Sequence, residues 1–116
     1  MTNFGKELRK IRLDLGITLF DMAKAINLSS AMLSSVETGK KAAPDDLVDR
    51  LANVYEVVRK EKQKFVQLAD LTKKEVRLAL DKREDATELA VAFARNFGQL
   101  SSAEIKQLMA VFEKHK

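Results

Sequence analysis

Residues 18–39, TLFDMAKAINLSSAMLSSVETG, contain the start and the end of two helices in quick succession. Thr18 is a favourable N-cap, and Asp21 stands three residues later, which gives a short version of the capping box. A helix is therefore predicted over roughly 19–26. From this helix Phe20 and Ala23 are expected to face the core.

The second half of this stretch predicts another helix. Asn27 tolerates a left-handed backbone and can end the first helix, and Ser29 or Ser30 can cap the next one. This helix is predicted to run to about Thr38, where Gly39 provides a C-terminal stop. Two short helices joined by a tight turn are typical of a helix-turn-helix.

Upstream, apolar residues recur at helical spacing. Phe4, Leu8, Ile11 and Leu15 fall on one face of a helix predicted over 3–15. Gly16 is expected to stop that helix. The first residues, Thr2 and Asn3, are candidates for a short N-terminal arm, which would reach towards a ligand.

Downstream, Pro44 suits the first turn of a fourth helix, and the acidic residues after it favour the positive end of the helix dipole. Leu47 and Val58 bound the apolar stripe of this helix, which is expected to break near Glu56. A fifth helix is predicted over 59–70, packed by a narrow apolar stripe.

The pattern changes after residue 74. Val76, Leu78 and Leu80 alternate with more polar positions, so a strand is predicted over 75–81. An isolated strand exposes unpaired backbone groups at both edges. We therefore expect it to pair with a second copy across a two-fold axis, which makes these three residues the predicted dimerisation contacts.

Two more helices are predicted at the end of the chain. The first covers residues 84–97 and ends at Gly98, and the second follows a capping box formed by Ser101 and Glu104. The alternative to dimerisation is that these helices pack their apolar residues on the preceding helix of the same chain.

The composition excludes several classes of protein. The 116 residues are 46% apolar and 33% charged, with a net charge of +4, so one small soluble protein with some affinity for polyanions is expected. No stretch is apolar enough for a membrane span or a signal peptide, and the cytoplasm is the expected compartment. Zero Cys and a single His, His115, argue against metals, cofactors and most catalysis.

Two adjacent serines in the first third of the chain are the candidate nucleophiles of an enzyme. Ser34 and Ser35 have no histidine near them in the sequence and no Ser-x-x-Lys motif around them. The paired carboxylates of Asp45 and Asp46 are better explained by a helix dipole. We therefore predict that the protein is not an enzyme and needs no cofactor.

Residues 8–57 resemble the Xre or Cro/phage-repressor helix-turn-helix family. The ordered elements that carry the resemblance are Leu8-Arg9, Arg12, Gly16, Thr18, Met22-Ala23, Leu33-Ser34, Val36-Glu37, Gly39 and Pro44. The resemblance implies a mainly α protein. It would have a five-helix, lambda-repressor-like DNA-binding domain over 1–72, then the strand and two helices over 73–116, and would form a homodimer.

The resemblance also implies an ion pair between Arg12 and Glu37, which would tie the first helix to the end of the third. The alternative is that both are solvated surface charges. It further implies that the third helix enters the major groove of DNA. The implied DNA-binding residues are Thr18, Leu19, Ser29, Ser30, Ala31, Met32, Ser34, Ser35, Thr38, Lys40 and Lys41.

One departure from the family changes the expected mode of reading. The family often has Gln at the start of the second and third helices, where this chain has Leu19, Ser30 and Ala31. Serine hydroxyls discriminate poorly between bases. Phosphate contacts, bridging waters and DNA shape are therefore expected to contribute more. Lys6 and Lys24 are additional candidates for phosphate contact.

Two functions follow from the resemblance. The first is a repressor that binds a palindromic operator as a homodimer through its third helix. The alternative is an antitoxin that represses its own operon and binds a toxin through its C-terminal half. Residues 75–114 are similar to C-terminal extensions of prophage-like regulators, which implies a dimerisation or effector segment.

Overall fold

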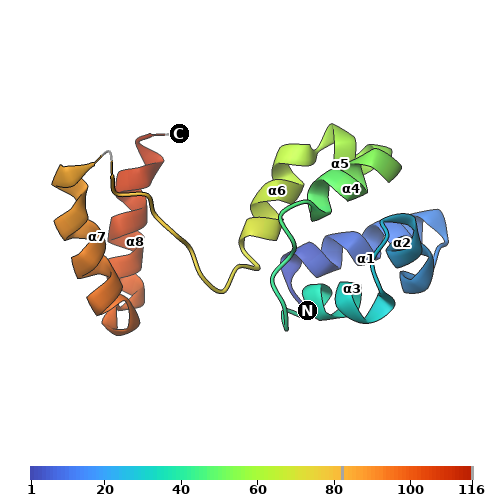
Figure 1. The fold of residues 1–116 in the computed structure, drawn as a ribbon, viewed down its shortest axis with the longest axis horizontal. Coiled ribbons are helices and arrows are strands. Elements are labelled where there is room, and N and C mark those ends of the chain that lie inside the picture. The colour runs from blue at the N-terminus through green and yellow to red at the C-terminus, as the bar shows by residue number, and fades with distance from the viewer. Residues whose placement is uncertain (82, 116) are drawn as a thin grey trace. The chain divides into compact units, whose positions relative to one another are not determined.

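The computed structural model describes residues 1–81 and 83–115 and divides the chain into two compact units, residues 1–76 and 77–116. Figure 1 shows the helices of each unit. The N-terminal unit contains α1 (Asn3–Leu15), α2 (Leu19–Ala25), α3 (Ser30–Glu37), α4 (Leu47–Val54), α5 (Glu56–Lys60) and α6 (Lys62–Asp70). The C-terminal unit contains α7 (Glu84–Asn96), the 3-10 turn η1 (Phe97–Gln99) and α8 (Ser102–Glu113).

The predicted starts and stops of the first three helices are confirmed. Gly16 ends α1 with φ of 67°, and Gly39 follows α3 with φ of 85°. Both lie in the left-handed region that glycine adopts without steric cost. Thr18 and Asp21 form the full reciprocal capping box of α2, and Ser29 caps α3.

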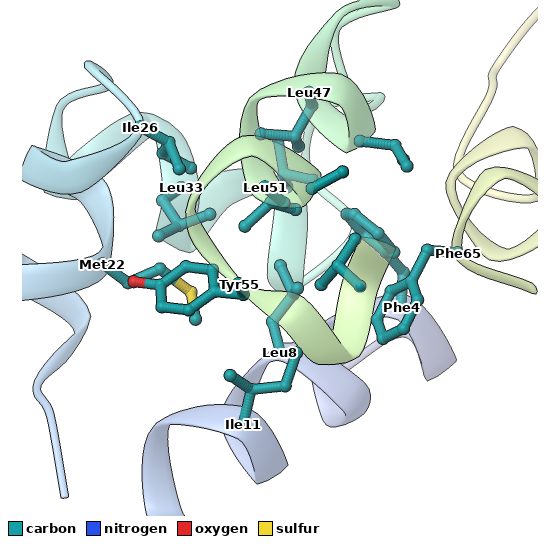
Figure 2. Close-up of a cluster of buried hydrophobic side chains, with 14 of the residues drawn as sticks. Phe4, Leu8, Ile11, Met22, Ile26, Leu33, Leu47, Leu51, Tyr55 and Phe65 are labelled. Atoms are coloured by element: carbon teal, nitrogen blue, oxygen red, sulfur yellow. The ribbon is translucent and has the colours of Figure 1, made fainter. Parts of the chain in front are cut away.

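The N-terminal unit has one apolar core. α1 packs against α2, α3 and α6, and α4 packs against α5 and α6. Figure 2 shows the side chains that these helices direct inward. The fully buried large residues are Phe4, Leu8, Met22, Leu33, Val36, Leu47, Leu51, Val58 and Phe65. Burying each contributes roughly 1.5–3 kcal/mol, so this core holds the helix pair α2–α3 in place.

The inward assignment of Phe20 is wrong, because its side chain is 63% exposed. Leu15, the last residue of the apolar face predicted for the first helix, is also exposed. The inward face of α2 passes through Met22 and Ala23. At about 100° per helical residue, Phe20 lies about 200° around the helix from Met22. The apolar character of Phe20 therefore does not indicate burial on this helix.

The region after α3 contains one more helix than predicted. The expected break near Glu56 is confirmed, since Tyr55 is extended between α4 and α5. The helix predicted over 59–70 is confirmed over α6 (Lys62–Asp70), but it starts later than predicted, because Glu61 leaves helical geometry (φ −115°, ψ 34°) and separates α5 from α6. Pro44 precedes α4 in a turn and is not part of its first helical turn.

The predicted strand is also wrong. Residues 75–81 form no strand, and Val76 and Leu78 are 75% and 66% exposed, while Leu80 is half-buried. A strand needs a neighbour for its backbone hydrogen bonds, and alternation in the sequence supplies none. The dimer contacts assigned to these three residues therefore lose their structural basis.

The C-terminal unit is a helical hairpin (Figure 1). The two predicted helices are confirmed, although α7 ends at Asn96 and η1 follows it. The capping box of Ser101 and Glu104 begins α8. Within residues 1–81 and 83–115, no helix has both the length and the apolar content needed to cross a bilayer.

Candidate nucleic-acid interface

The candidate interface is the outward face of α3 together with the segments at its two ends. Leu33 and Val36 are fully buried, so the opposite side of α3 points away from the core. Ser29 Oγ accepts a hydrogen bond from the backbone N–H of Met32 at 3.0 Å, which satisfies one free donor of the first turn. α3 therefore presents a short, capped helix with small side chains outward.

The turn between α2 and α3 is held by a residue that sequence reasoning missed. Asn27 adopts a left-handed conformation with φ of 59°. Arg50 Nη1 donates to the carbonyl oxygens of Ile26 and Asn27 at 3.1 and 3.2 Å, and Arg50 Nε pairs with Asp46 at 2.9 Å. The only available signal was the i, i+4 spacing of Asp46 and Arg50, which does not reveal the turn as their target.

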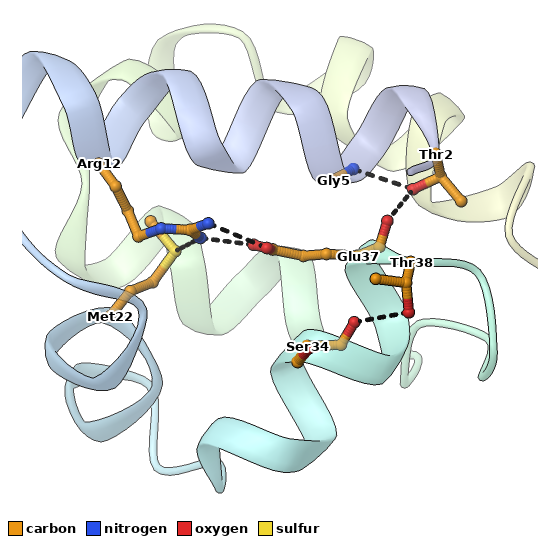
Figure 3. Close-up of polar contacts among 7 residues, drawn as sticks. All are labelled: Thr2, Gly5, Arg12, Met22, Ser34, Glu37 and Thr38. Atoms are coloured by element: carbon orange, nitrogen blue, oxygen red, sulfur yellow. Dashed lines mark hydrogen bonds and ion pairs between the residues drawn. The ribbon is translucent and has the colours of Figure 1, made fainter.

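The C-terminal end of α3 is connected to α1 by a bidentate ion pair (Figure 3). Arg12 Nη1 lies 2.5 Å from Glu37 Oε2, and Arg12 Nη2 lies 2.9 Å from Glu37 Oε1. Arg12 is 8% exposed and Glu37 is 3% exposed. The structure thus places both groups inside the fold, and the alternative of two solvated charges does not describe them.

A second junction between α1 and α3 lies at the backbone of Glu37. Its carbonyl oxygen accepts from the N–H of Thr2 at 3.0 Å and from Thr2 Oγ1 at 3.1 Å (Figure 3). Thr2 Oγ1 also accepts from the N–H of Gly5 and caps α1. Thr2 is therefore part of the fold, and its assignment to a DNA-binding arm is wrong.

Gly5 allows this approach. A Cβ on Gly5 would overlap the carbonyl oxygen of Glu37 and lie 2.9 Å from both its carbonyl carbon and its Cα. Sequence reasoning missed this role, although a glycine inside a helical pattern is itself a signal of close packing.

The structure places the predicted DNA-binding residues in three groups. Thr18, Ser29, Ala31, Thr38, Lys40 and Lys41 are exposed; Ser30, Ser34 and Ser35 are partly exposed; Leu19 and Met32 are partly buried against the core. Two of the hydroxyls, those of Thr18 and Ser29, accept cap hydrogen bonds. An accepting hydroxyl still carries its own O–H, which can donate to a phosphate oxygen.

A further lysine joins the loop after α3. Lys74 Nζ donates to the carbonyl oxygen of Gly39 at 2.8 Å, which places it beside the loop that carries Lys40 and Lys41. Thr72 Oγ1 accepts from the N–H of Ala43 at 2.8 Å and fixes the other end of this loop. Lys74 was not predicted because it is 35 residues from its partner in sequence.

A shallow groove lies beside the N-terminus of α3. Phe20 and Lys24 line it from α2, and Ser29 and Ser30 line it from the start of α3. The exposed ring of Phe20 thus lies next to a cation and two hydroxyls. These groups extend the candidate surface from α3 onto α2.

The α2 capping box gives a testable electrostatic effect. The backbone N–H and the hydroxyl of Thr18 lower the pKa of Asp21 from its ordinary value of 3.8. Because the folded-state pKa is depressed, Asp21 contributes stability above its ordinary pKa, and this contribution is lost as pH falls through the lower folded-state value.

Thr18→Ala should raise the Asp21 pKa, as measured by carboxyl NMR titration. It should also cost about 1 kcal/mol of stability at neutral pH. An unchanged Asp21 pKa would contradict the role of the hydroxyl.

Comparison with known proteins agrees with this geometry. A family model described as a helix-turn-helix domain matches residues 3–65, which is more than half of the chain. No curated protein and no solved structure matches the chain significantly. The matched residues include α1 to α5 and the turn that Arg50 holds. The chain belongs to the helix-turn-helix domain family.

Proposed function

We propose that this protein is a sequence-specific DNA-binding repressor of the Xre or Cro/phage-repressor kind. It acts in the cytoplasm, and its homodimer occupies a palindromic operator with α3 in the major groove. The observation that carries this proposal is the fixed presentation of α3. Its inner side is buried through Leu33 and Val36, and its outer side is small and exposed, with lysines following it.

The chemistry of α3 supports close approach more than direct base reading. Ser30, Ala31 and Ser34 are small, so the helix backbone can lie deep in the groove. Hydroxyls distinguish bases less well than the bidentate contacts of Arg, Asn or Gln. Phosphate contacts then fix the register, and sequence-dependent DNA shape supplies part of the specificity.

Lysines near both ends of α3 support contact with the phosphates of a bound duplex. Lys40, Lys41 and Lys74 surround the end of α3, and Lys24 lies near its start. Basic groups at both ends of one helix suit the two phosphate strands that border a groove. We assign DNA binding to residues 1–72 and dimerisation to residues 73–116.

One module of this size makes few base contacts, so a dimer on a palindrome is the economical arrangement. Two copies related by a two-fold axis reach successive major grooves about 34 Å apart. Footprinting on the DNA around the protein's own coding region should show a protected palindrome, and its affinity should fall with salt. The absence of any protected site would overturn autoregulation.

Replacing Lys40 and Lys41 by Ala should weaken binding to every DNA sequence by a similar factor. Each lost phosphate contact should reduce the slope of log K against log salt by roughly 1 per lysine in each subunit. Titrations at several salt concentrations with operator and random DNA measure both effects. Lys60→Ala with Lys62→Ala, on α5 and α6 across the unit from α3, is the matched control and should change neither (Figure 1). A selective loss on the operator alone would mean that the two lysines read bases.

The antitoxin is the second candidate function. The observation that favours it is the apolar surface of the α7–α8 hairpin, which a toxin would cover. Purification from the native host separates the candidates, because an antitoxin would bring a stoichiometric second protein with it. A homodimer without such a protein would favour the repressor.

A further inference from the structure

The α7–α8 hairpin exposes nearly all of its large apolar side chains. No described residue of α7, η1 or α8 is buried. Large apolar side chains between 37% and 69% exposed are Leu89, Val91, Phe93, Phe97, Ile105, Leu108, Met109, Val111 and Phe112. In the N-terminal unit the same residue types form a closed core. The hairpin by itself therefore lacks a core.

Helices of this length need packing to persist. α7 has 13 residues and α8 has 12, and isolated helices of that size are marginal in water. Chains below about 40 residues seldom bury enough surface to fold without metals, disulfides or association. The chain has no cysteine. Contact with another polypeptide surface is the remaining way to cover these side chains, and the candidates are the N-terminal unit of the same chain and a second chain.

Charges beside the apolar stripe of α8 favour a second copy of the chain as the occupant. Ile105, Met109 and Phe112 mark the stripe, and Lys106 and Glu113 lie along the same edge of it, about two helical turns apart. When two such helices meet antiparallel across a two-fold axis near Met109, Lys106 of each copy faces Glu113 of the other. The edge is therefore complementary to itself, as an isologous interface requires.

The overall charge of the unit does not oppose this pairing. Residues 77–116 contain seven basic and six acidic residues, so two copies have little net repulsion. A partner chosen by charge attraction would need a more strongly charged surface than this one. Residues 75–81 form no strand, so they offer no ladder for a dimer.

We propose that the α7–α8 hairpin pairs with that of a second copy, with α8 antiparallel to its symmetry mate, to form a four-helix bundle. This inference rests on the proposed function, because a palindromic operator requires two modules. It replaces strand pairing through Val76, Leu78 and Leu80 with helix packing centred on Met109.

The test is the oligomeric state of the full chain by sedimentation equilibrium. The unmodified protein should be a dimer, and Met109→Glu should weaken self-association by about 100-fold, because it places a carboxylate in the bundle core. The matched control is Leu71→Glu, which changes an apolar side chain that is 79% exposed and lies outside the hairpin. It should leave the dimer intact. A monomeric unmodified chain, or a dimer insensitive to Met109→Glu, would overturn the proposal.

A charge exchange tests the antiparallel register without disturbing apolar packing. Glu113→Lys should place like charges opposite Lys106 and weaken the dimer roughly fivefold to tenfold. Adding Lys106→Glu should restore it, because the pairs re-form with reversed signs. Failure of the double variant to recover, with helix content unchanged by circular dichroism, would overturn this register.

DNA binding is measured separately by footprinting on the same samples. A monomer that still protects a specific site would overturn the hairpin interface and leave the repressor proposal standing. A stable hairpin dimer that protects no site would overturn the repressor and leave the interface standing. A monomer found only in a complex with a different protein would overturn the second copy as occupant and favour the antitoxin.

Discussion

Glu37→Ala should lower the free energy of unfolding by about 3–5 kcal/mol, because it leaves the buried guanidinium of Arg12 without its partner. Both charges of this pair lie inside the fold, and two hydrogen bonds connect them. The only other hydrogen bond that the guanidinium of Arg12 makes in the described structure is to the sulfur of Met22, 3.5 Å away. A thioether is a weak acceptor and cannot replace a carboxylate. Urea denaturation measures the loss.

The control uses the same substitution at an exposed ion pair. Glu56 pairs with Lys60 at 3.5 Å, and both side chains are largely in solvent. Glu56→Ala should cost no more than about 0.5 kcal/mol. Equal effects at the two sites would contradict the special role of burial at Glu37.

A second control separates the value of the pair from the cost of breaking it. The double variant Arg12→Met with Glu37→Leu removes both charges and keeps apolar volume. It should be more stable than Glu37→Ala, because no buried charge is left unpaired. At low temperature, where the Glu37→Ala variant still folds, operator binding should persist, since neither residue faces the DNA in our proposal. Loss of binding in a fully folded Glu37→Ala variant would show that the pair also sets the position of α3.

The parts of the fold that sequence predicted are those encoded by neighbouring residues. The caps of α2 and α8 depend on a hydroxyl and a carboxylate three residues apart, and both capping boxes are present. The stops at Gly16 and Gly39 depend on one residue each. Such signals can be read from a single chain, and the order of the helices followed from them.

Features that depend on distant segments were not predicted. Arg50 is 23 residues from Asn27 in sequence, and Lys74 is 35 residues from Gly39. The sequence around Arg50 and around Lys74 does not indicate which distant residue each one contacts. The prediction of a strand over 75–81 was wrong for a related reason. Alternating apolar residues describe one segment and do not show whether a second strand lies beside it. For Phe20, the helix was predicted correctly, but the side of the helix that faces the core was not.

The candidate DNA surface was predictable in its members more than in their roles. The resemblance pointed to Ser29 and Thr18, and both lie at exposed helix starts. Their cap hydrogen bonds show that each also stabilises a helix, which a motif match does not reveal. Substitutions at these two positions will therefore change stability as well as any contact with DNA.

Gly5→Ala should destabilise the protein, although the same change usually stabilises a helix interior by about 1 kcal/mol. The added methyl would overlap the carbonyl oxygen of Glu37, and the obstacle is backbone, which cannot rotate away as a side chain can. Forcing such a group into a packed contact costs about 1–3 kcal/mol, and separating α1 from α3 also breaks the two hydrogen bonds from Thr2 to Glu37. A net loss of about 2 kcal/mol or more is expected from urea denaturation.

Two other glycines separate close contact from backbone strain. Gly16 has φ of 67° with no described atom within 4 Å of a Cβ, so Gly16→Ala tests strain alone and should cost about 1 kcal/mol. Gly98 has neither a positive φ nor a described neighbour within that distance, and Gly98→Ala should be neutral or slightly stabilising. If Gly5→Ala behaved like Gly98→Ala, α1 would have room to move away from α3. The close contact at Glu37 would then not be what sets the position of the helix proposed to enter the DNA groove.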